Sequence, residues 1–434
     1  MHIFFSGIGG TGLGPLALIA HQAGYTVSGS DKQDSQYIHY LKDHGLANIH
    51  IGQSEDQIKD VHGKNPIDWY VYSSAVMIEQ PNAPELEFCR ANGIRMTKRD
   101  ELLSTIITDK KLKLIAIAGT HGKTTTTAMA IWLAIRLGIP ASHSVGGKIP
   151  FGEMGTYTPG SEYFIYEADE FDRNFLTFQP YLSIITGIDW DHPDIYPTRQ
   201  EYQDAFGQFI GQSAHTIMWQ DDAEKLGLQT SDKFTLVSES DHEVPTIRLA
   251  GIVNRQDAWQ VAKAFSHITG SPVEELIEHL NMFPGVSRRF EQLMPRLYTD
   301  YAHTPPKIRG TLETAEEVAP GNVVVVYEGL HNTRQHFIKD DLGNLFDRVK
   351  HLYIVPSYLA REDESLQLLT PEDLKNFLSK PAQAKTTPAE LNPRLKESIS
   401  THLVNGDTVV CISAGGGGSL DEWLRREFVA PPEA

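Results

Sequence analysis

The segment Leu114–Thr127 reads Leu-Ile-Ala-Ile-Ala-Gly-Thr-His-Gly-Lys-Thr-Thr-Thr-Thr, an apolar run that leads into a glycine-rich turn. Gly119 and Gly122 allow the backbone to turn tightly, so that several N–H groups can point at one anion. A helix that begins at the turn adds its positive N-terminal end. Lys123 is placed to reach the β- and γ-phosphates of a nucleotide, and the Thr124 hydroxyl to bind Mg²⁺. The segment therefore predicts a strand, a phosphate-binding loop and a helix that together bind ATP or GTP.

This loop differs from the usual phosphate-binding motif at one position, because Ile117 stands where a glycine is usual, five residues before Gly122. The strand before the loop, the helix after it and the Lys-Thr pair still favour a nucleotide site over a chance glycine-rich turn. We expect the triphosphate to contact Gly119, Thr120, His121, Gly122, Lys123, Thr124 and Thr125.

The bulk composition indicates a soluble globular protein with more than one domain. A chain of 434 residues is too long for one core, and 40% hydrophobic with 22% charged residues is ordinary for globular domains. The net charge of −18 opposes non-specific binding to nucleic acid. The N-terminus reaches a glycine-rich turn too early for a signal peptide, and no apolar run has membrane-spanning length. We therefore expect a cytoplasmic monomer or homodimer with no nucleic-acid or membrane partner.

Three segments of the chain each begin with an apolar run followed by a turn and a helix, which is the pattern of parallel α/β sheets. We expect domains at 1–109, 110–284 and 285–434, with the second boundary where Pro284 and Gly285 interrupt a helical pattern. The predicted fold class is α/β with three domains. A Rossmann-like N-terminal domain precedes a central P-loop ATPase domain with a mostly parallel sheet, and a Rossmann-like C-terminal domain follows.

Within these domains the apolar runs and turn residues predict individual elements. The expected strands are Ile3–Ser6, Tyr25–Ser28, Lys113–Ala118, Tyr163–Glu167, Leu182–Thr186, Asn322–Tyr327 and Thr408–Ser413. The expected helices are Leu13–Gly24, Thr124–Leu137 and Leu420–Phe428. The polar stretch Ser231–Val244 is expected to be a hairpin or loop.

A second glycine-rich turn, Gly7–Gly12, follows the first strand and precedes a helix. Asp31 comes after the next strand, where an acidic residue can hydrogen-bond a ribose. Alone, this turn is typical of NAD or FAD binding, but the same geometry serves any diphosphate, including a UDP-sugar. We expect its ligand to contact Gly9, Gly10, Thr11, Gly12 and Asp31.

Acidic residues follow the strand Tyr163–Glu167, ending at Asp169 and Glu170. Carboxylates at the end of a strand beside a phosphate loop are where a nucleotide site needs Mg²⁺ ligands. The run Asp189–Pro193, which includes His192, also follows a strand. Together with the loop, the two clusters favour a metal site at this end of the sheet.

Two arginines, Arg288 and Arg289, lie just past the second domain boundary. Guanidinium groups suit phosphate oxygens, so an arm that closes over ATP is one interpretation. A surface ion pair is the alternative. The nearby run Tyr298–Pro305 contains an acid, two tyrosines and a histidine, and indicates nothing by itself.

In this order, the motifs resemble the Mur ligases, ATP-dependent amide-forming enzymes of peptidoglycan precursor synthesis. The resemblance covers nearly the whole chain and rests on the glycine-rich first domain, the loop from Gly119, the acidic strand end, the Asp191-His192 pair, Arg288-Arg289-Phe290-Glu291 and Asp300-Tyr301-Ala302-His303. Gly7–Gly12 with Asp31, Ser73-Ser74-Ala75 and His121 in the loop are most similar to the members that attach L-alanine to UDP-N-acetylmuramate. Like those members, the chain has no lysine in Tyr202–Phe209, where others carry a carbamylated one.

The resemblance implies a reaction and a set of roles. ATP and Mg²⁺ would activate the lactyl carboxylate of UDP-N-acetylmuramate as an acyl phosphate, which the amine of L-alanine then attacks, while a closing third domain excludes water. The implied catalytic residues are Lys123, Glu167, His192 and Arg289. The implied metal ligands are Thr124, Glu167 and His192. Implied ATP contacts outside the loop are Asn254, Arg289 and Asp300, and implied substrate contacts outside the glycine-rich turn are Ser73, Ser74, His303 and Arg334.

Some positions depart from the family pattern. Val253 stands where the family has a histidine beside the adenine, next to Asn254. The stretch Tyr327–Arg334 is closer to ligases that attach a recycled tripeptide to the same nucleotide sugar. A tripeptide acceptor is therefore the alternative to L-alanine, and an NAD-dependent oxidoreductase is a more distant alternative that rests on Gly7–Gly12 alone.

Overall fold

A computed structural model describes residues 1–73, 76, 81–192, 195–229, 231–359, 362–363 and 365–429. The chain forms two compact units. The first contains Met1–Ile247 and Gln256–Phe283, and the second contains Arg248–Arg255 and the chain from Pro284 onward. No helix in the described part of the chain is long and apolar enough to cross a membrane.

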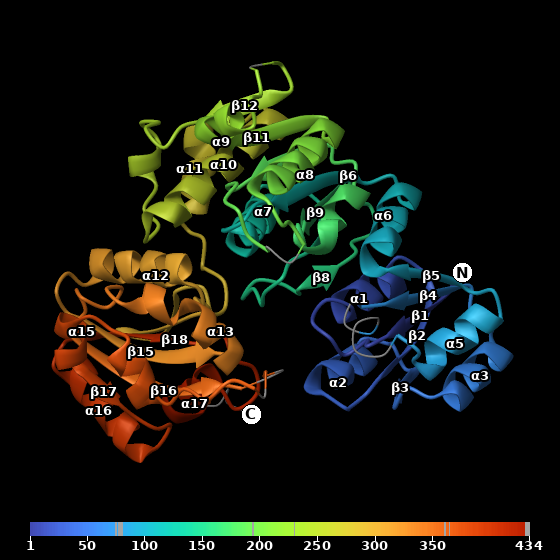
Figure 1. Cartoon of the computed structure of the whole chain (residues 1–434). Helices are drawn as coiled ribbons and strands as arrows, with labels where there is room; N and C mark the ends of the chain where they lie inside the picture. The colour runs from blue at the N-terminus through green and yellow to red at the C-terminus, as the bar shows by residue number, and fades with distance from the viewer. Residues whose placement is uncertain are drawn as a thin grey trace. The chain divides into compact units, whose positions relative to one another are not determined.

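The first unit begins with a parallel sheet that carries the glycine-rich turn (Figure 1). Its strand order is β3 (Ile49–Ile51), β2 (Thr26–Asp31), β1 (His2–Ser6), β4 (Trp69–Tyr72) and β5 (Arg95–Lys98). The accompanying helices are α1 (Gly14–Gln22), α2 (Gln36–Asp43), α3 (Glu55–Lys64), α5 (Pro84–Ala91) and α6 (Arg99–Asp109). Because the strand order reverses at β1, a ligand crevice is expected beyond the carboxyl ends of β1 and its neighbours.

A second sheet in the same unit carries the phosphate-binding loop. Its order is β12 (Phe234–Val237), β11 (His215–Trp219), β10 (Leu182–Ile185), β6 (Lys113–Ala118), β9 (Tyr163–Glu167), β7 (Ala141–Ser144) and β8 (Gly155–Thr156). Only β8 is antiparallel to its neighbour among the described strands of this sheet. Its helices are α7 (Lys123–Arg136), α8 (Arg199–Gln212), α9 (Gln220–Lys225), α10 (Ile252–Thr269) and α11 (Val273–Leu280), with short 3₁₀ helices η1 (Phe171–Thr177) and η2 (Val244–Thr246).

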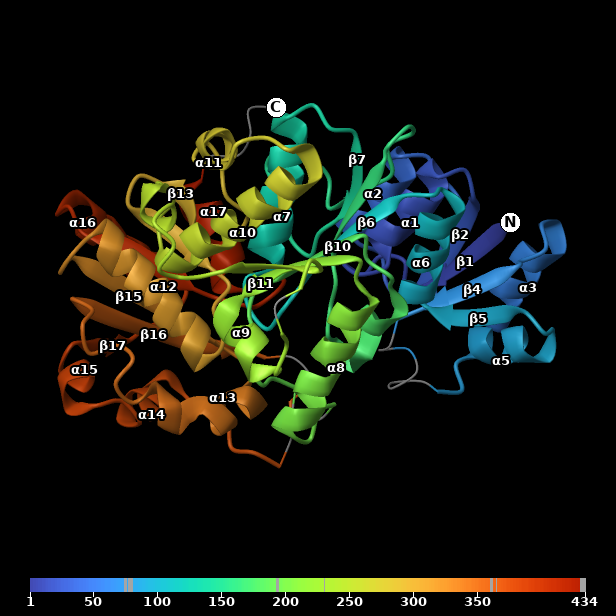
Figure 2. The same cartoon turned by 90° about the horizontal axis from the view of Figure 1, so that it is seen from above.

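Packing joins the two sheets of the first unit. Helix α1 lies against β8 (Figure 1), and α6 lies against η1. Figure 2 shows α1 and α6 next to one another, seen from above. A Cβ added to Gly155 would lie 2.7 Å from Pro15 Cβ, so the backbones approach closely there. The Gln22 side-chain oxygen accepts a hydrogen bond of 2.7 Å from the Tyr157 N–H. One buried apolar cluster takes side chains from both sheets, which fixes the glycine-rich turn relative to the phosphate loop.

The second unit contains a third sheet, whose order is β13 (Glu291–Met294), β14 (Leu297–Asp300), β18 (Thr408–Ile412), β15 (Val323–Leu330), β16 (His351–Tyr358) and β17 (Thr386–Pro388). Its helices are α12 (Pro305–Val318), α13 (Asn332–Ile338), α14 (Pro371–Asn376), α15 (Lys380–Ala384), α16 (Pro393–Val404) and α17 (Leu420–Phe428), with the short 3₁₀ helix η3 (Lys339–Leu342). Every residue of β15 is buried, as expected for a parallel strand covered on both faces.

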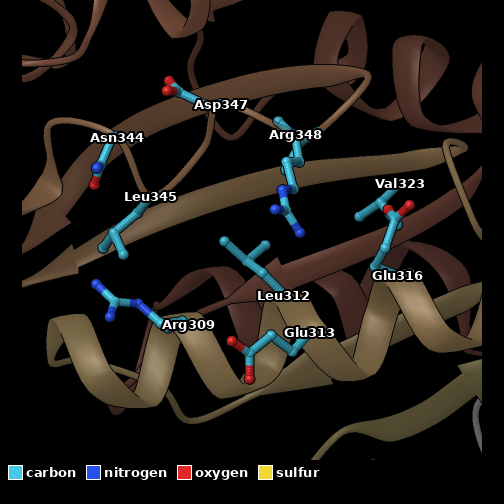
Figure 3. A pocket seen from close by; sticks show the side chains of 10 residues that line it. Arg309, Leu312, Glu313, Glu316, Val323, Asn344, Leu345, Asp347 and Arg348 are labelled. Carbon is cyan, nitrogen blue, oxygen red and sulfur yellow. The ribbon is translucent and has the colours of Figure 1, made fainter.

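A hollow of about 450 Å³ opens beside α12 in the second unit. Figure 3 shows Arg309, Leu312 and Glu313 on this helix, facing Leu345 and Arg348 from a later segment. None of the site residues predicted from the sequence lines this hollow.

The predicted fold class is confirmed. The strands at Lys113–Ala118 and Tyr163–Glu167 and the helix Leu420–Phe428 form with the predicted bounds. The expectation for Ser231–Val244 is wrong in part, because β12 lies within it and pairs in parallel with β11. Polar residues such as Thr235 hid this strand, which lies at the edge of the sheet and is only partly buried. The domain boundaries after 109 and 284 stay predictions.

Candidate active site

The phosphate-binding loop needs glycine at two positions. Gly119 and Gly122 have φ angles of +143° and +80°, which residues other than glycine rarely adopt. A Cβ on Gly119 would lie 2.2 Å from Thr186 Oγ1, and one on Gly122 would lie 2.9 Å from both carboxylate oxygens of Asp257. The loop therefore keeps its shape only with these glycines, and it leads directly into the N-terminus of α7, whose first turn has no acidic residue. This is an electropositive end suited to a phosphate.

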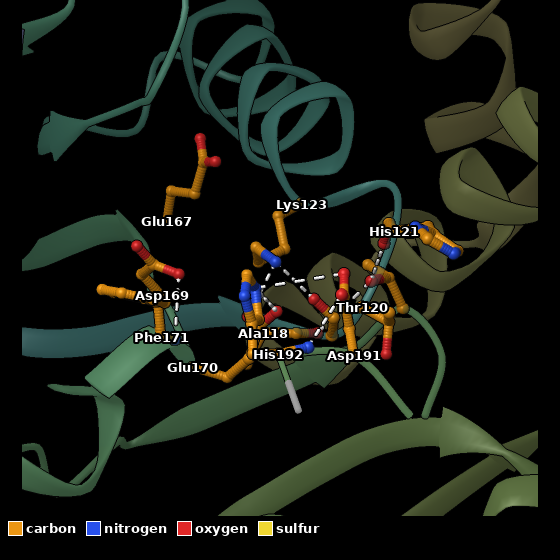
Figure 4. Close-up of polar contacts among 12 residues, drawn as sticks. Ala118, Thr120, His121, Lys123, Glu167, Asp169, Glu170, Phe171, Asp191 and His192 are labelled. Atoms are coloured by element: carbon orange, nitrogen blue, oxygen red, sulfur yellow. Dashed lines mark hydrogen bonds and ion pairs between the residues drawn. The ribbon is translucent and has the colours of Figure 1, made fainter. Parts of the chain in front are cut away.

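Lys123 lies beside the loop and is held by two oxygen acceptors. Its Nζ donates to the Gly119 carbonyl at 2.6 Å and to Glu170 Oε2 at 2.7 Å (Figure 4). The Glu170 side chain is only 1% exposed. Burial lowers the pKa of Lys123, but the negative charge of Glu170 outweighs that effect, so the pKa is raised and the amine stays protonated. This cation is fixed where a triphosphate's terminal charge would lie.

Thr124 and Glu167 bring together two oxygen donors. The Thr124 hydroxyl donates to Glu167 Oε1 at 2.8 Å, and the Gly146 N–H donates to Glu167 Oε2 at 2.6 Å. A hydroxyl and a carboxylate in contact beside a phosphate loop are ligands of the kind Mg²⁺ takes, with nucleotide phosphates and water completing its shell. The donor chemistry of this pair therefore fits the Mg²⁺ that the family resemblance implies.

His192 lies on the other side of Lys123, near Glu170. Its Nε2 is 3.8 Å from Glu170 Oε1 and 3.9 Å from Asp191 Oδ2, and its ring meets the Phe171 ring edge-on at 5.2 Å. Its φ of +55° is unusual for a residue with a side chain and indicates a position held by its surroundings. Among the described residues, no three His, Cys, Asp or Glu side chains converge as a preformed metal site. His192 and Glu167 would therefore need oxygen atoms of the nucleotide to complete any metal shell.

Loop residues that the sequence predicted as ATP contacts also brace the loop. Thr120 Oγ1 donates to the Asp189 carbonyl at 2.6 Å and lies 2.9 Å from the Tyr202 hydroxyl. The His121 carbonyl accepts a hydrogen bond from Thr186. Thr125 lies in the first turn of α7. These bonds tie the loop to the adjoining strand end that leads to His192.

The glycine-rich turn has the geometry of a diphosphate site. Gly7 has a φ of +85°, and its N–H donates to the Ser30 carbonyl at 2.8 Å. The Gly9 N–H donates to Asp31 Oδ2 at 2.8 Å, so this carboxylate supports the turn itself. Helix α1 begins directly after the turn without an acidic residue in its first turn. Of the two serines predicted here, Ser73 accepts a backbone bond from Val76 through its carbonyl, and Ser74 lies outside the described residues.

One cavity of about 180 Å³ joins the two glycine-rich loops. Its walls contain Thr11 and Gly12 from the first sheet, and Lys123 and Glu167 from the second. The structure therefore brings the predicted diphosphate turn and the predicted triphosphate loop to a single site. The remaining lining residues are Leu16, Arg99, Leu103, Ser144, Val145, Gly146, Tyr166 and Asp169.

Arg99 and Asp169 are charged residues of this cavity that were not among the predicted contacts. Arg99 Nη2 is 3.4 Å from Asp169 Oδ2, although the two are far apart in the chain. Asp169 belongs to the acidic run after β9, which the sequence indicated as a source of Mg²⁺ ligands without assigning a role to Asp169 itself. Arg99 is the first residue of α6, where no local motif surrounds it, so only the fold shows its place.

The second unit gathers another set of predicted residues. Asp300 accepts hydrogen bonds from the Phe290 N–H at 2.6 Å and from the Thr311 hydroxyl at 2.9 Å, and burial raises its pKa. The Arg289 guanidinium lies over the Tyr301 ring, 5.0 Å from its centroid. Asp300 therefore links Phe290, in the Arg288–Glu291 segment, to Thr311 on α12.

His303 lies in the same part of the second unit. Its Nδ1 is 3.1 Å from the Tyr301 carbonyl, and burial, with the nearby charges of Lys307, Arg334 and Arg289, lowers its pKa to about 3. A neutral imidazole near two arginines can accept or donate a hydrogen bond without adding charge. The charges of Arg289 and Arg334 therefore act on His303 within the second unit. The implied acceptor and nucleotide contacts of these three residues stay predictions.

Asn254 also belongs to the second unit, in the first turn of α10. Its side-chain amide donates to the Ala250 carbonyl at 2.7 Å. The adjacent Arg255 makes a two-pronged ion pair with Glu317, with N–O distances of 2.7 and 3.2 Å. The implied adenine contact of Asn254 stays a prediction.

Comparison with known proteins gives the same family as the motifs. Residues 2–111 match the Mur ligase family, catalytic domain, and residues 117–268 match the Mur ligase middle domain. A UDP-N-acetylmuramate–L-alanine ligase from Clostridium perfringens is 29% identical, with 95% of each chain covered. One from Renibacterium salmoninarum is 30% identical, covering 95% of this chain and 93% of that protein.

Two solved structures share the fold. UDP-N-acetylmuramate-alanine ligase MurC from Thermotoga maritima has a TM-score of 0.75 at 23% identity, covering 98% of both chains. A murein peptide ligase from Psychrobacter arcticus has a TM-score of 0.62 at 22% identity, covering 100% of both chains. With matched domains that carry both glycine-rich loops, and relatives aligned over nearly their whole length, the chain belongs to the Mur ligase family.

Proposed function

We propose that this protein is an ATP-dependent ligase that joins L-alanine to the lactyl carboxylate of UDP-N-acetylmuramate in peptidoglycan precursor synthesis. The observation that carries the proposal is the cavity shared by Thr11, Gly12, Lys123 and Glu167. A diphosphate bound at the first loop and a triphosphate bound at the second would face one another across this cavity. The names of the relatives, which align over 95% of this chain, support the same substrates.

The first step that this geometry supports is activation of the carboxylate. Carboxylate and amine do not condense usefully in water, so the carboxylate must gain a leaving group. A carboxylate oxygen attacks the γ-phosphorus of ATP, the bond to the β-phosphate bridge oxygen breaks, and ADP leaves. The fixed ammonium of Lys123 and the N-terminus of α7 would stabilise the charge on the transferred group. Mg²⁺, when bound, would be held by Thr124 and Glu167, with His192 at a second position, and would offset phosphate charge.

The second step forms the amide bond. The amine of the acceptor attacks the acyl carbon, the carbon–phosphate oxygen bond breaks, and inorganic phosphate leaves with the amine losing a proton. We propose that His303 and Arg334 contact the acceptor. The arginine would suit the acceptor's carboxylate, and the neutral imidazole would add no positive charge beside its amine.

The acceptor has one competing assignment. The stretch Tyr327–Arg334 differs from the usual sequence of alanine-adding members and is closer to ligases that use a tripeptide. The fold similarity to a murein peptide ligase is compatible with either acceptor, because the fold alone does not define the substrate. The relatives in sequence favour L-alanine.

A phosphate-release assay tests the proposal. Purified protein is mixed with ATP, Mg²⁺ and UDP-N-acetylmuramate, and then with L-alanine, glycine, L-serine or the tripeptide L-alanyl-γ-D-glutamyl-meso-diaminopimelate. We expect L-alanine to give the highest kcat/KM. If phosphate release requires the tripeptide, the acceptor is the tripeptide and not L-alanine. If no acceptor increases phosphate release, the ligase assignment is contradicted. An NADH fluorescence titration without a binding signal would remove the oxidoreductase alternative.

A further inference from the structure

Arg99 is a cation in the wall of the shared cavity. A Cβ added to Gly12 of the glycine-rich turn would lie 2.7 Å from Arg99 Nη1, so the guanidinium lies directly against the turn. On its other side, Nη2 is 3.4 Å from Asp169 Oδ2, and Nε is 3.6 Å from Asp100 Oδ2. The Arg99 side chain is 32% exposed, which leaves part of it open to the cavity.

The place of Arg99 on its helix is electrostatically unfavourable. It is the first residue of α6, and a cation at a helix N-terminus opposes the helix dipole. Nearby carboxylates offset this cost, but their bonding is shared. Asp100 Oδ1 accepts from the Tyr166 hydroxyl at 2.9 Å, and Asp169 Oδ1 accepts from the Phe171 N–H at 3.1 Å. The contacts of Arg99 itself, at 3.4 and 3.6 Å, are long for charge-assisted bonds.

The donors of Arg99 exceed its acceptors. A guanidinium has five N–H donors in a planar fork. Within the described part of the chain, no hydrogen bond to Nη1 is present, and this is the nitrogen beside Gly12. An anion bound at the glycine-rich turn would lie beside the Nη1 donors of the Arg99 guanidinium. Phosphate oxygens match these donors in geometry and charge.

We propose that Arg99 binds the diphosphate of the nucleotide sugar, together with the backbone of Gly9–Gly12. This inference rests on the proposed function and names a binding residue for it. The triphosphate has its own cation in Lys123, which belongs to the phosphate-binding loop and is paired with Glu170. Arg99, which approaches the turn from α6, is therefore assigned to the UDP moiety and not to ATP.

The test is a calorimetric titration of the whole protein with UDP, with UDP-N-acetylmuramate and with ATP. Arg99→Gln is expected to lower the affinity for both uridine nucleotides about 10- to 100-fold, the loss expected for charge-assisted hydrogen bonds. The affinity for ATP should stay unchanged. Arg99→Lys keeps the charge without the fork and is expected to recover part of the affinity. In turnover, Arg99→Gln should raise KM for UDP-N-acetylmuramate while kcat stays near that of the unaltered enzyme.

Lys98→Gln is the matched control. Lys98 is the preceding cation, pairs with Asp172 and does not line the cavity, so its loss removes the same charge without the contact. We expect unaltered UDP affinity for this variant. If Lys98→Gln and Arg99→Gln lose the same UDP affinity, the loss comes from the change in net charge and the assignment of Arg99 is overturned.

Other results separate this inference from the proposed function. Unchanged UDP affinity in Arg99→Gln, or an equal loss for ATP, overturns the role of Arg99 alone. If the unaltered protein binds UDP but releases no phosphate with any acceptor, the ligase assignment fails and the UDP titration still decides Arg99. If it binds no uridine nucleotide, both fail. Should Arg99→Gln not fold, the Arg99→Lys titration decides, and full affinity there overturns the role of the fork.

Discussion

The proposed phosphoryl transfer depends on the ion pair between Lys123 and Glu170, which holds the lysine beside the phosphate-binding loop. The carboxylate is 1% exposed, and burial raises its pKa above the ordinary value despite the opposing lysine. Such a pair adds little net stability, because desolvation consumes much of its Coulomb energy. Its benefit is position, since the carboxylate and the Gly119 carbonyl hold the ammonium at one point beside the loop.

Lys123→Ala is expected to lower the rate of ADP formation about 100- to 1,000-fold, because a fixed cation no longer stabilises the transferred phosphoryl group. Lys123→Arg keeps a charge opposite Glu170 and separates lost activity from lost stability. Lys113→Ala removes an exposed lysine that pairs with Glu162 at the start of β6, and should be neutral. Near-normal ADP formation by Lys123→Ala would contradict the role of this residue.

His303 makes stability depend on pH. Its pKa is about 3 in the folded protein, well below the ordinary histidine value, because it is buried near cations. Between about pH 6.5 and pH 3 the unfolded chain binds one more proton than the folded chain, so stability falls as pH falls through this range. The contribution of this one proton to the free energy of unfolding is about 1.4 kcal/mol per pH unit at most. In urea unfolding, His303→Asn should lose less stability than the unaltered protein between pH 7.5 and 5.5, and an equal loss in both would contradict the assignment.

The sequence predicted candidate site residues where they lie in local motifs. Lys123 and Thr124 were predicted from the loop after β6 and Glu167 from the acidic end of β9, and the structure brings Thr124 and Glu167 into contact. Arg99 could not be predicted in this way, because its neighbours Gly12 and Asp169 come from segments distant in the chain. Asp31 shows a further limit, since the motif predicts a ribose contact and the structure shows a bond to the Gly9 N–H.

At the scale of elements, the unit of function is β6, its loop and α7. The apolar run predicts β6, and burial of α7, including Met129, Ile131 and Leu133, stabilises the helix despite its four threonines. Gly119 and Gly122 allow the loop between the two elements to turn. Strands with buried apolar runs were therefore predictable, whereas β12 was not, since it is short, polar and only partly buried at the edge of its sheet. Burial by tertiary neighbours decided the structure of that segment.

Two glycines at the ends of α7 allow a controlled test. Gly122 and Gly138 both have positive φ, +80° and +66°, so alanine at either should cost about 1–3 kcal/mol of stability. Only Gly122→Ala also places a Cβ against the Asp257 carboxylate. At Gly138, no atom of the described residues beyond its chain neighbours lies within 4 Å of an added Cβ.

We expect Gly122→Ala to abolish ATP binding and Gly138→Ala to keep it, as measured by calorimetry on folded protein. Equal ATP affinity in the two variants would show that the loop tolerates a side chain.

At the scale of the whole molecule, each compact unit has its own buried cores. Apolar clusters of the first unit draw on β1 to β11, and those of the second on β14 to β18 and their helices. The glycine-rich turn and the phosphate loop both belong to the first unit. We therefore expect two thermal unfolding transitions. UDP should raise the midpoint temperature of the transition that belongs to the first unit and leave the other midpoint unchanged. A single transition, or an equal shift of both, would contradict independent cores.

In the proposed reaction, the carboxylate of the nucleotide sugar receives the terminal phosphoryl group of ATP across the cavity between the two glycine-rich loops. Its most direct test uses UDP-N-acetylmuramate labelled with ¹⁸O in the lactyl carboxylate, with ATP and L-alanine, and mass spectrometry of the released phosphate. Transfer through an acyl phosphate predicts one ¹⁸O atom in each phosphate released. Amide product accompanied by unlabelled phosphate would contradict the account.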